Sequence, residues 1–169
     1  MLINTKHQRR WLNLAGVCAV VGLIAYALFA QHVLGLEACP LCIFQRVAFI
    51  TGGLVFLVAG LHSPGGVSAR FYGALALAAN VIGGGVAARH VYIQNLPADQ
   101  VPPDCGAGLD YMLDVFGPFE AVRMVLTSAG ECADISWQFL GLSMPGWAFV
   151  WFVLLGALAV AANWTRLPN

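Results

Sequence analysis

The chain has 169 residues, of which 60% are hydrophobic and only 9% are charged, and its formal net charge is zero. Soluble domains carry roughly 25% charged residues, so this composition is typical of a protein that lies in a membrane. A net charge of zero gives no reason to expect a nucleic-acid partner.

Four apolar stretches follow one another along the chain, each close to the roughly 20 residues that a membrane-spanning helix needs. They cover about residues 12–30, 43–61, 71–88 and 142–162. Helices of a soluble bundle would carry polar stripes, and these stretches have almost none. We therefore predict an all-α membrane protein, in which residues 1–169 form a single integral membrane domain, a four-transmembrane-helix bundle.

The positions of the basic residues predict the orientation of these helices. Lys and Arg are concentrated before the first stretch, between the second and third, and after the fourth: Lys6, Arg9, Arg10, Arg70 and Arg166. The other two connections, about residues 31–42 and 91–141, contain a single such residue, Arg123. We predict that both termini are cytoplasmic and that these two loops lie on the outer face.

The first stretch could also be read as a cleavable signal peptide, because a basic segment precedes it and small residues end it. Its apolar run is longer than the roughly 7–15 residues usual in such signals. Cleavage would also leave three spans and place the new N-terminus outside. We therefore expect an uncleaved first helix.

A short amphipathic helix is predicted at Phe119–Ser128, within the second outer loop. Val122, Val125 and Leu126 give it an apolar side. Because the segment is too short to span a bilayer, we expect it to lie on the outer surface and to hold Cys132 near the membrane.

Four of the five cysteines, Cys39, Cys42, Cys105 and Cys132, map to the outer loops or their junctions with helices. An oxidising compartment favours disulfides there, so two structural bridges are one explanation. However, a helix bundle already satisfies its own backbone, and the small ring of a Cys-x-x-Cys bridge tends towards reactivity. We favour disulfide exchange coupled to an electron acceptor in the bilayer. Cys18, in mid-span, is expected to be a small hydrophobe without a role.

A zinc site is a further alternative, since a Cys-x-x-Cys pair and two more thiolates make a plausible ligand set. Such sites usually repeat the close pair, whereas 26 residues separate Cys105 from Cys132. Structural zinc is also disfavoured where disulfides form readily. We predict no metal.

The residues around the Cys-x-x-Cys pair predict a reactive thiolate. Pro40 suits the first position of a helix, which would place Cys39 at the N-cap and Cys42 at the third helical position. The helix dipole and the positive charge of Arg46, one turn further on, would both favour the thiolate form of Cys42. An arginine in an apolar stretch is a candidate functional residue, although it could instead extend to the lipid headgroups.

His90 lies near the outer end of the third stretch, at a depth similar to that of Arg46. It could hydrogen-bond a quinone carbonyl there, or it could be an amphipathic anchor at the membrane interface. We expect the neighbouring Arg89 to contact headgroups. In the loop that follows, prolines around Cys105 favour extended backbone, which can lie in the groove of a partner protein.

Three segments resemble the DsbB family of bacterial inner-membrane disulfide-forming proteins, in the order found in that family. They are Cys39-Pro-Leu-Cys-Ile-Phe-Gln-Arg46, Cys105 in its proline-rich loop, and the stretch from Gly130-Glu-Cys-Ala through Trp137-Gln-Phe-Leu-Gly-Leu-Ser-Met-Pro145. The resemblance covers nearly the whole chain. Vitamin K epoxide reductases also combine four helices, a Cys-x-x-Cys pair and quinone, but their pair usually lies near the end of the chain.

The resemblance implies an inner-membrane protein with its active site on the periplasmic face. Its partners would be a DsbA-like thioredoxin-fold oxidase, membrane lipid and a quinone, either ubiquinone or menaquinone. In this family the DsbA thiolate would attack Cys105 of a Cys105–Cys132 disulfide. Freed Cys132 could then attack Cys39 and release Cys42 as a thiolate.

By the same resemblance, Cys42 would form a charge-transfer contact or adduct with the quinone, and Arg46 would stabilise the negative charge. His90 matches a histidine implicated in quinone binding. Re-formation of the Cys39–Cys42 disulfide would deliver two electrons to the quinone. The competing hypothesis is a non-catalytic four-helix membrane protein with two structural disulfides, whose sign would be polar residues deep in the spans; Asn80 is the one candidate.

Overall fold

The computed structural model describes residues 6–97, 99–101, 109–127 and 132–164. Cys105, which the sequence places at the start of the exchange, therefore lies outside the described residues. The last residue of the predicted amphipathic helix, Ser128, lies outside them as well.

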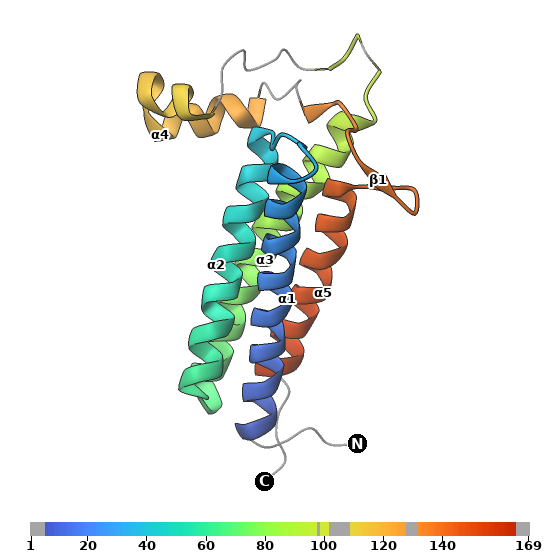
Figure 1. Cartoon of the computed structure of the whole chain (residues 1–169). Coiled ribbons are helices and arrows are strands. Elements are labelled where there is room, and N and C mark those ends of the chain that lie inside the picture. The colour runs from blue at the N-terminus through green and yellow to red at the C-terminus, as the bar shows by residue number, and fades with distance from the viewer. Residues whose placement is uncertain (1–5, 98, 102–108, 128–131, 165–169) are drawn as a thin grey trace.

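Four long helices form the body of the molecule: α1 (Lys6–His32), α2 (Pro40–His62), α3 (Gly66–Gln94) and α5 (Met144–Trp164). All four are long and apolar enough to cross a membrane, with a mean hydropathy between 1.5 and 2.2 in their most apolar windows. The helices run side by side, and α1 begins at the same end of the bundle at which α5 ends (Figure 1). The predicted all-α, four-helix membrane architecture is confirmed.

The first three helices extend beyond the predicted apolar stretches at both ends, because backbone hydrogen bonding continues where the side chains become polar. The α3 helix is an example, since it passes through Arg89 and His90 and ends at Gln94. The α5 helix begins at Met144, and the two residues before it belong to a strand.

Glycines allow the helices to approach one another closely, as small residues commonly do in membrane bundles. A Cβ atom at Gly83 of α3 would lie 2.3 Å from the ring of Phe152 in α5. A Cβ atom at Gly53 of α2 would lie 2.8 Å from Val20 in α1. The ring of Phe152 is also stacked on Phe49 of α2, with 3.8 Å between ring centroids. These contacts form the centre of the core.

Three buried asparagines lie along the described part of the bundle, and each has a partner within the protein. Asn13 and Asn163 exchange hydrogen bonds between α1 and α5, at 3.4 and 3.1 Å. Asn80 donates to the backbone oxygen of Ala76 in its own helix, at 2.8 Å. These side chains stabilise helices and helix contacts, so Asn80 gives no support to a polar path through the membrane.

At the end of the bundle where α2 begins, called the thiol end below, α4 (Leu109–Thr127) extends sideways from the four helices (Figure 1). A kink at Gly117, with φ 74° and ψ 168°, precedes Pro118 and divides the helix. The predicted amphipathic helix corresponds to the second part, where Ala121 and Val125 are buried. The first part, from Leu109, was not predicted.

A two-stranded hairpin completes the thiol end. Strands β1 (Gln138–Phe139) and β2 (Leu142–Ser143) pair antiparallel, and Gln138 lies opposite Ser143. The turn between them requires positive φ at Leu140 and Gly141. The indole nitrogen of Trp147 in α5 donates to the backbone oxygen of Phe139 at 3.0 Å, which holds the hairpin against the bundle.

Candidate functional site

The α2 helix begins at the predicted position. Cys39 is the N-cap residue with extended backbone, Pro40 follows as the first helical residue, and Cys42 is the third. The sulfurs of Cys39 and Cys42 are 3.3 Å apart and share a hydrogen bond, so the pair is a dithiol. Both sulfurs therefore lie at the first turn of the helix, where backbone N–H groups have no partner within the helix.

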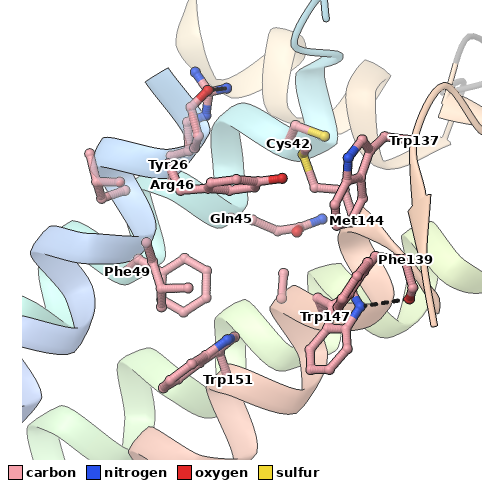
Figure 2. Close-up of a pocket in the computed structure, with 14 residues that line it drawn as sticks. Tyr26, Cys42, Gln45, Arg46, Phe49, Trp137, Phe139, Met144, Trp147 and Trp151 are labelled. Carbon is pink, nitrogen blue, oxygen red and sulfur yellow. Dashed lines mark hydrogen bonds between the residues drawn. The ribbon is translucent and has the colours of Figure 1, made fainter. Parts of the chain in front are cut away.

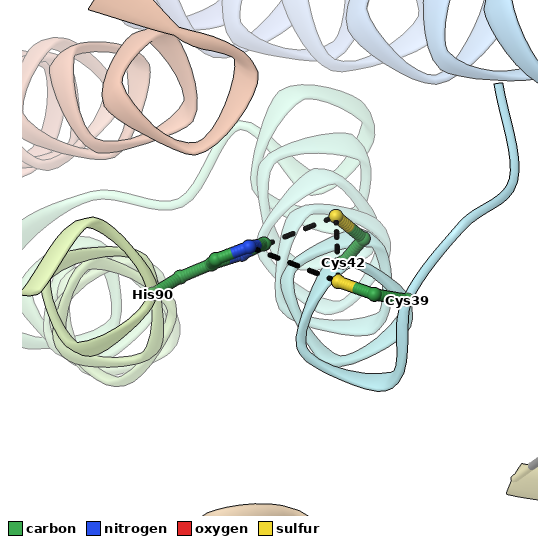
Figure 3. A group of neighbouring side chains, drawn as sticks. All are labelled: Cys39, Cys42 and His90. Carbon is green, nitrogen blue, oxygen red and sulfur yellow. Dashed lines mark hydrogen bonds between the residues drawn. The ribbon is translucent and has the colours of Figure 1, made fainter. Parts of the chain in front are cut away.

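His90, from the last turns of α3, lies beside both sulfurs (Figure 3). Its Nε2 atom is 3.8 Å from the sulfur of Cys39, and its Nδ1 atom is 4.0 Å from the sulfur of Cys42. The Nδ1 atom also lies 3.1 Å from the amide nitrogen of Gln45. The imidazole is only 2% exposed, so protein groups rather than bulk water surround it.

Cys132 reaches the same cluster from the loop that follows α4. It is buried, and it packs with Leu41, Ile93 and Val125. Hydrogen bonds from the thiols of Cys132 and then Cys42 lower the pKa of Cys39 far below its ordinary value, although burial acts in the opposite direction. The contact with Cys39, followed by burial, raises the pKa of the Cys132 thiol above its ordinary value.

Arg46 is half-buried and bonds to the neighbouring helix. Its guanidinium donates to the backbone oxygen of Ala27 at 3.2 Å and to the side-chain oxygen of Gln31, both in α1. These contacts hold the positive charge within the protein, whereas an arginine that only anchored the helix would point to the headgroups.

Two cavities meet at this cluster. The first has a volume of about 300 Å³ and a mostly apolar wall, built by α1, α2, α5 and the hairpin (Figure 2). Its aromatic lining consists of Tyr26, Phe49, Trp137, Phe139, Trp147 and Trp151. Cys42, Gln45 and Arg46 are its polar or reactive wall residues. This cavity can hold a flat, largely apolar molecule with a polar group directed at Cys42.

The second cavity has a volume of about 230 Å³ and shares Cys42 with the first. It is lined by Cys39, Cys132 and His90, and also by the acidic residues Glu37 and Asp134. The reactive and charged side chains that line both cavities are Cys42 and Arg46. His90 lines only this second cavity, so the structure places it with the thiols and outside the aromatic cavity.

A family model described as disulfide bond formation protein DsbB matches residues 9–162 of the chain. The chain belongs to the DsbB family. It is 51% identical over 151 residues to disulfide bond formation protein B of Xanthomonas campestris pv. campestris (strain 8004), covering 89% of this chain and 87% of the relative. It is 52% identical over 140 residues to the protein of that name from Saccharophagus degradans, covering 83% and 84%. The protein of that name from Hahella chejuensis is 47% identical over 152 residues, covering 89% and 90%.

Membership of the DsbB family confirms the resemblance inferred from the three sequence segments. Together with four helices able to span a bilayer, it identifies a multi-pass membrane protein of disulfide bond formation. Of the four cysteines predicted to react, the structure brings three together, Cys39, Cys42 and Cys132. Cys105 lies outside the described residues.

The cluster in this DsbB-family chain also has the spacing of a metal site. Cys39, Cys42 and His90 each offer one ligand atom, and these atoms lie within 4.8 Å of one another. Zinc accepts this type of ligand. The expectation that no metal is bound therefore stays a prediction, which metal analysis of the purified protein can test.

Two parts of the site were not predicted from the sequence. Gln45 is a polar residue at the start of an apolar stretch, which is a signal of function in membrane helices, but the sequence does not show its contact with His90. The aromatic wall, including Tyr26 and Trp151, depends on how α1, α5 and the hairpin meet, which no local pattern shows.

Proposed function

We propose that this protein re-oxidises a periplasmic DsbA-like thiol oxidase by disulfide exchange and passes the electrons to a quinone in the bacterial inner membrane. The observation that carries this proposal is the position of Cys42 and Arg46 in the walls of both cavities. A sulfur placed in this way can take part in exchange on one side and in electron transfer on the other.

On the exchange side, the thiolate of the partner attacks Cys105 of a Cys105–Cys132 disulfide and Cys132 leaves. Cys132 attacks Cys39 of the Cys39–Cys42 disulfide, and Cys42 leaves as a thiolate. The second thiol of the partner then displaces Cys105, which releases the oxidised partner. Cys105 attacks Cys132, and Cys39 leaves, so that Cys39 and Cys42 now hold the electron pair as a dithiol.

The proximity of Cys132 to Cys39 supports the second of these steps. The two thiols are within hydrogen-bonding distance, and Cys39 is the sulfur of the pair that Cys132 contacts. Attack on Cys39 makes Cys42 the leaving group, and a sulfur leaves faster when its thiolate is stabilised. The start of α2 and the charge of Arg46 provide that stabilisation.

The aromatic cavity fits a quinone headgroup. Ligand pockets of roughly 300–1,000 Å³ with apolar walls and a few polar groups are typical of such sites, and this one has Gln45 and Arg46 beside Cys42. When bound, ubiquinone or menaquinone would accept two electrons and two protons as the Cys39–Cys42 disulfide re-forms. Tyr26, Trp147 and Trp151 would surround the ring with apolar surface and exclude water.

Arg46 would stabilise negative charge at the sulfur and at the acceptor oxygen. Its bonds to Ala27 and Gln31 fix the guanidinium, so little reorganisation is needed as charge develops. In an apolar cavity this effect is larger than in water.

The orientation is part of the proposal. The predicted cytoplasmic segments lie at the start of α1 and the end of α5, and the thiol end is the opposite end of the bundle (Figure 1). The positive-inside rule therefore directs the cysteines to the periplasm. Lipid would surround the four helices.

The test uses purified protein, a reduced DsbA-type oxidase and short-chain ubiquinone or menaquinone, with quinone reduction followed by ultraviolet absorbance. We expect turnover in the wild type, and none in Cys42→Ser and Cys105→Ser. Arg46→Ala should lower turnover roughly ten- to hundredfold, the effect of losing a charged hydrogen-bond donor.

Matched controls come from the same chain. Cys18→Ser changes an exposed cysteine of α1, and Arg123→Ala removes an arginine whose side chain is 70% exposed in α4. Both should keep wild-type rates. Absence of quinone reduction in the wild type, with all disulfides unchanged, would contradict the proposal and favour two structural bridges.

A further inference from the structure

We propose that Gln45 is a positioning residue that fixes the tautomer of His90, so that the N–H group at Nε2 of the imidazole donates a hydrogen bond to the sulfur of Cys39. The inference rests on the proposed function for its purpose, since it concerns the step in which Cys39 leaves Cys132. The structural part can be tested without a quinone or a partner protein.

The first step is the contact between Gln45 and His90. The side-chain nitrogen of Gln45 lies 3.1 Å from Nδ1 of the imidazole. An amide nitrogen can only donate, so Nδ1 must accept the hydrogen bond, and a neutral imidazole then carries its proton on Nε2. Gln45 is 4% exposed and His90 is 2% exposed, so water does not compete for this contact.

The second step concerns the two sulfurs. The Nε2 atom is 3.8 Å from the sulfur of Cys39, within the range of a hydrogen bond to sulfur. Cys42 faces Nδ1 at 4.0 Å, but that nitrogen has a single lone pair, already occupied by the closer Gln45. His90 therefore acts on Cys39, and it does not act as a base towards Cys42.

Of the three described side chains that contact the imidazole nitrogens of His90, Gln45 and Cys39 lie closer than Cys42. The ionisable residues that line the cavity with His90 are Glu37, Cys39, Cys42, Arg46, Cys132 and Asp134. After the larger contributions of Cys132 and Cys42, the hydrogen bond from His90 also lowers the pKa of Cys39. The contact with the imidazole and the contacts with the two thiols all favour the thiolate form of Cys39.

The consequence for the reaction lies in regeneration. When Cys105 attacks Cys132, the Cys132–Cys39 bond breaks and its electron pair stays on Cys39 as a thiolate. A leaving sulfur departs faster when its thiolate is stabilised, and the N–H group of His90 provides this stabilisation. A carboxylate in place of the Gln45 amide would accept a hydrogen bond from an N–H group at Nδ1, which reverses the direction of the hydrogen bond.

The direct test is nitrogen NMR of the reduced full-length protein labelled at its four histidines, since the two tautomers have distinct nitrogen shifts. We expect His90 to be the Nε2–H tautomer in the wild type. In Gln45→Met, which removes the donor and keeps the length of the side chain, we expect a mixture of tautomers. A wild-type His90 with its proton on Nδ1 would overturn the inference.

The second measurement is the rate of Cys39 alkylation, read by mass spectrometry of the reduced protein. Gln45→Met should move the alkylation profile of Cys39 towards higher pH, so that alkylation on the acid limb of the profile slows roughly three- to tenfold, the effect of weakening one hydrogen bond. The same change in a His90→Phe background should have no further effect, because Gln45 acts through His90. An equal effect in both backgrounds would overturn the inference.

Asn80→Met is the matched control, since it removes a buried amide of α3 that bonds to its own backbone away from the thiols. It should change neither the tautomer nor the alkylation rate. If the NMR and alkylation results are as expected and the wild type fails to reduce quinone, the proposed function is wrong and the positioning role stands. If the wild type reduces quinone and the NMR and alkylation results differ from those expected, only the positioning role is rejected.

Discussion

At the scale of single residues, Cys39 is the sulfur on which the contacts converge. Cys42, Cys132 and His90 all lie within hydrogen-bonding distance of it. The sequence predicted the stabilised thiolate at Cys42, from the helix start and from Arg46 alone. Sequence spacing shows neighbours within one helix, whereas His90 and Cys132 reach Cys39 from other segments.

These contacts predict a pH dependence of thiol reactivity in the reduced protein. A lowered pKa means that Cys39 remains a thiolate as the pH falls well below 9.0, the ordinary thiol value. A raised pKa means that Cys132 stays protonated until the pH rises above that value. Only a thiolate is alkylated rapidly, so the profile of Cys39 should lie on the acid side of that of Cys132.

The measurement is the fraction of each cysteine alkylated by iodoacetamide in short pulses across the pH range, read by mass spectrometry. The pH midpoints of the two profiles are compared in place of the absolute rates, because burial of Cys132 slows its reaction at every pH. His90→Phe should move the Cys39 profile towards higher pH. Coincident profiles near the ordinary thiol value would contradict the assigned contacts.

At the scale of helices, the thiol cluster depends on how closely α3 packs against its neighbours. Gly83, two turns before His90, lies against the ring of Phe152, which is itself stacked on Phe49. The ring cannot move aside easily, because α2 and α3 enclose it. A Cβ atom at Gly83 would also lie 2.8 Å from Ala48 of α2, so this glycine allows α3, which carries His90, to lie close to α2.

We therefore expect Gly83→Ala to destabilise the bundle by about 1–3 kcal/mol, the usual cost of overpacking a core. Gly85→Ala is the matched control, because a Cβ atom there has no neighbour within 4 Å. Unfolding of both variants in mixed micelles would measure the difference. Equal stability of the two variants would show that the contact at Gly83 is not tight.

The sequence predicted the four helices but not where they end. Hydropathy locates the apolar stretch, and α3 continues past it to Gln94 because its backbone hydrogen bonds do not depend on apolar side chains. In contrast, Pro40 located the start of α2 correctly, since proline has a specific reason to occupy the first helical position. The hairpin before α5 has no strong local signal, and its role is set by contacts such as that of Trp147.

At the scale of the whole molecule, the thiols and the basic residues of the predicted cytoplasmic segments lie at opposite ends of the bundle. The thiols, His90 and the hairpin lie at the thiol end, and the described basic residues of the predicted cytoplasmic segments, Lys6, Arg9, Arg10 and Arg70, lie at the other end. Composition and charge were enough to predict this arrangement. The division of the site into two cavities could not be predicted, because residues of α1, α2, α5 and the hairpin all contribute to it.

This polarity predicts the topology in the membrane. A fluorescent protein fused after the C-terminus should fluoresce, because it folds in the cytoplasm, and alkaline phosphatase fused at Gln100 should be active, because it folds in the periplasm. A fusion of the same phosphatase at Ser63, between α2 and α3, is the matched control and should be inactive. The reverse pattern would place the cysteines on the cytoplasmic face and exclude the proposed partner.

The position of Cys42 between two cavities has a consequence for kinetics. Under the proposed function, the reduced partner and the lipid-soluble acceptor bind on different sides of one sulfur, so neither needs to be present when the other reacts. The dithiol can store one electron pair after the first substrate has departed. Such an enzyme follows a ping-pong scheme. Its rate in the cell is set by the scarcer of its two substrates, the reduced partner protein and the lipid-soluble acceptor.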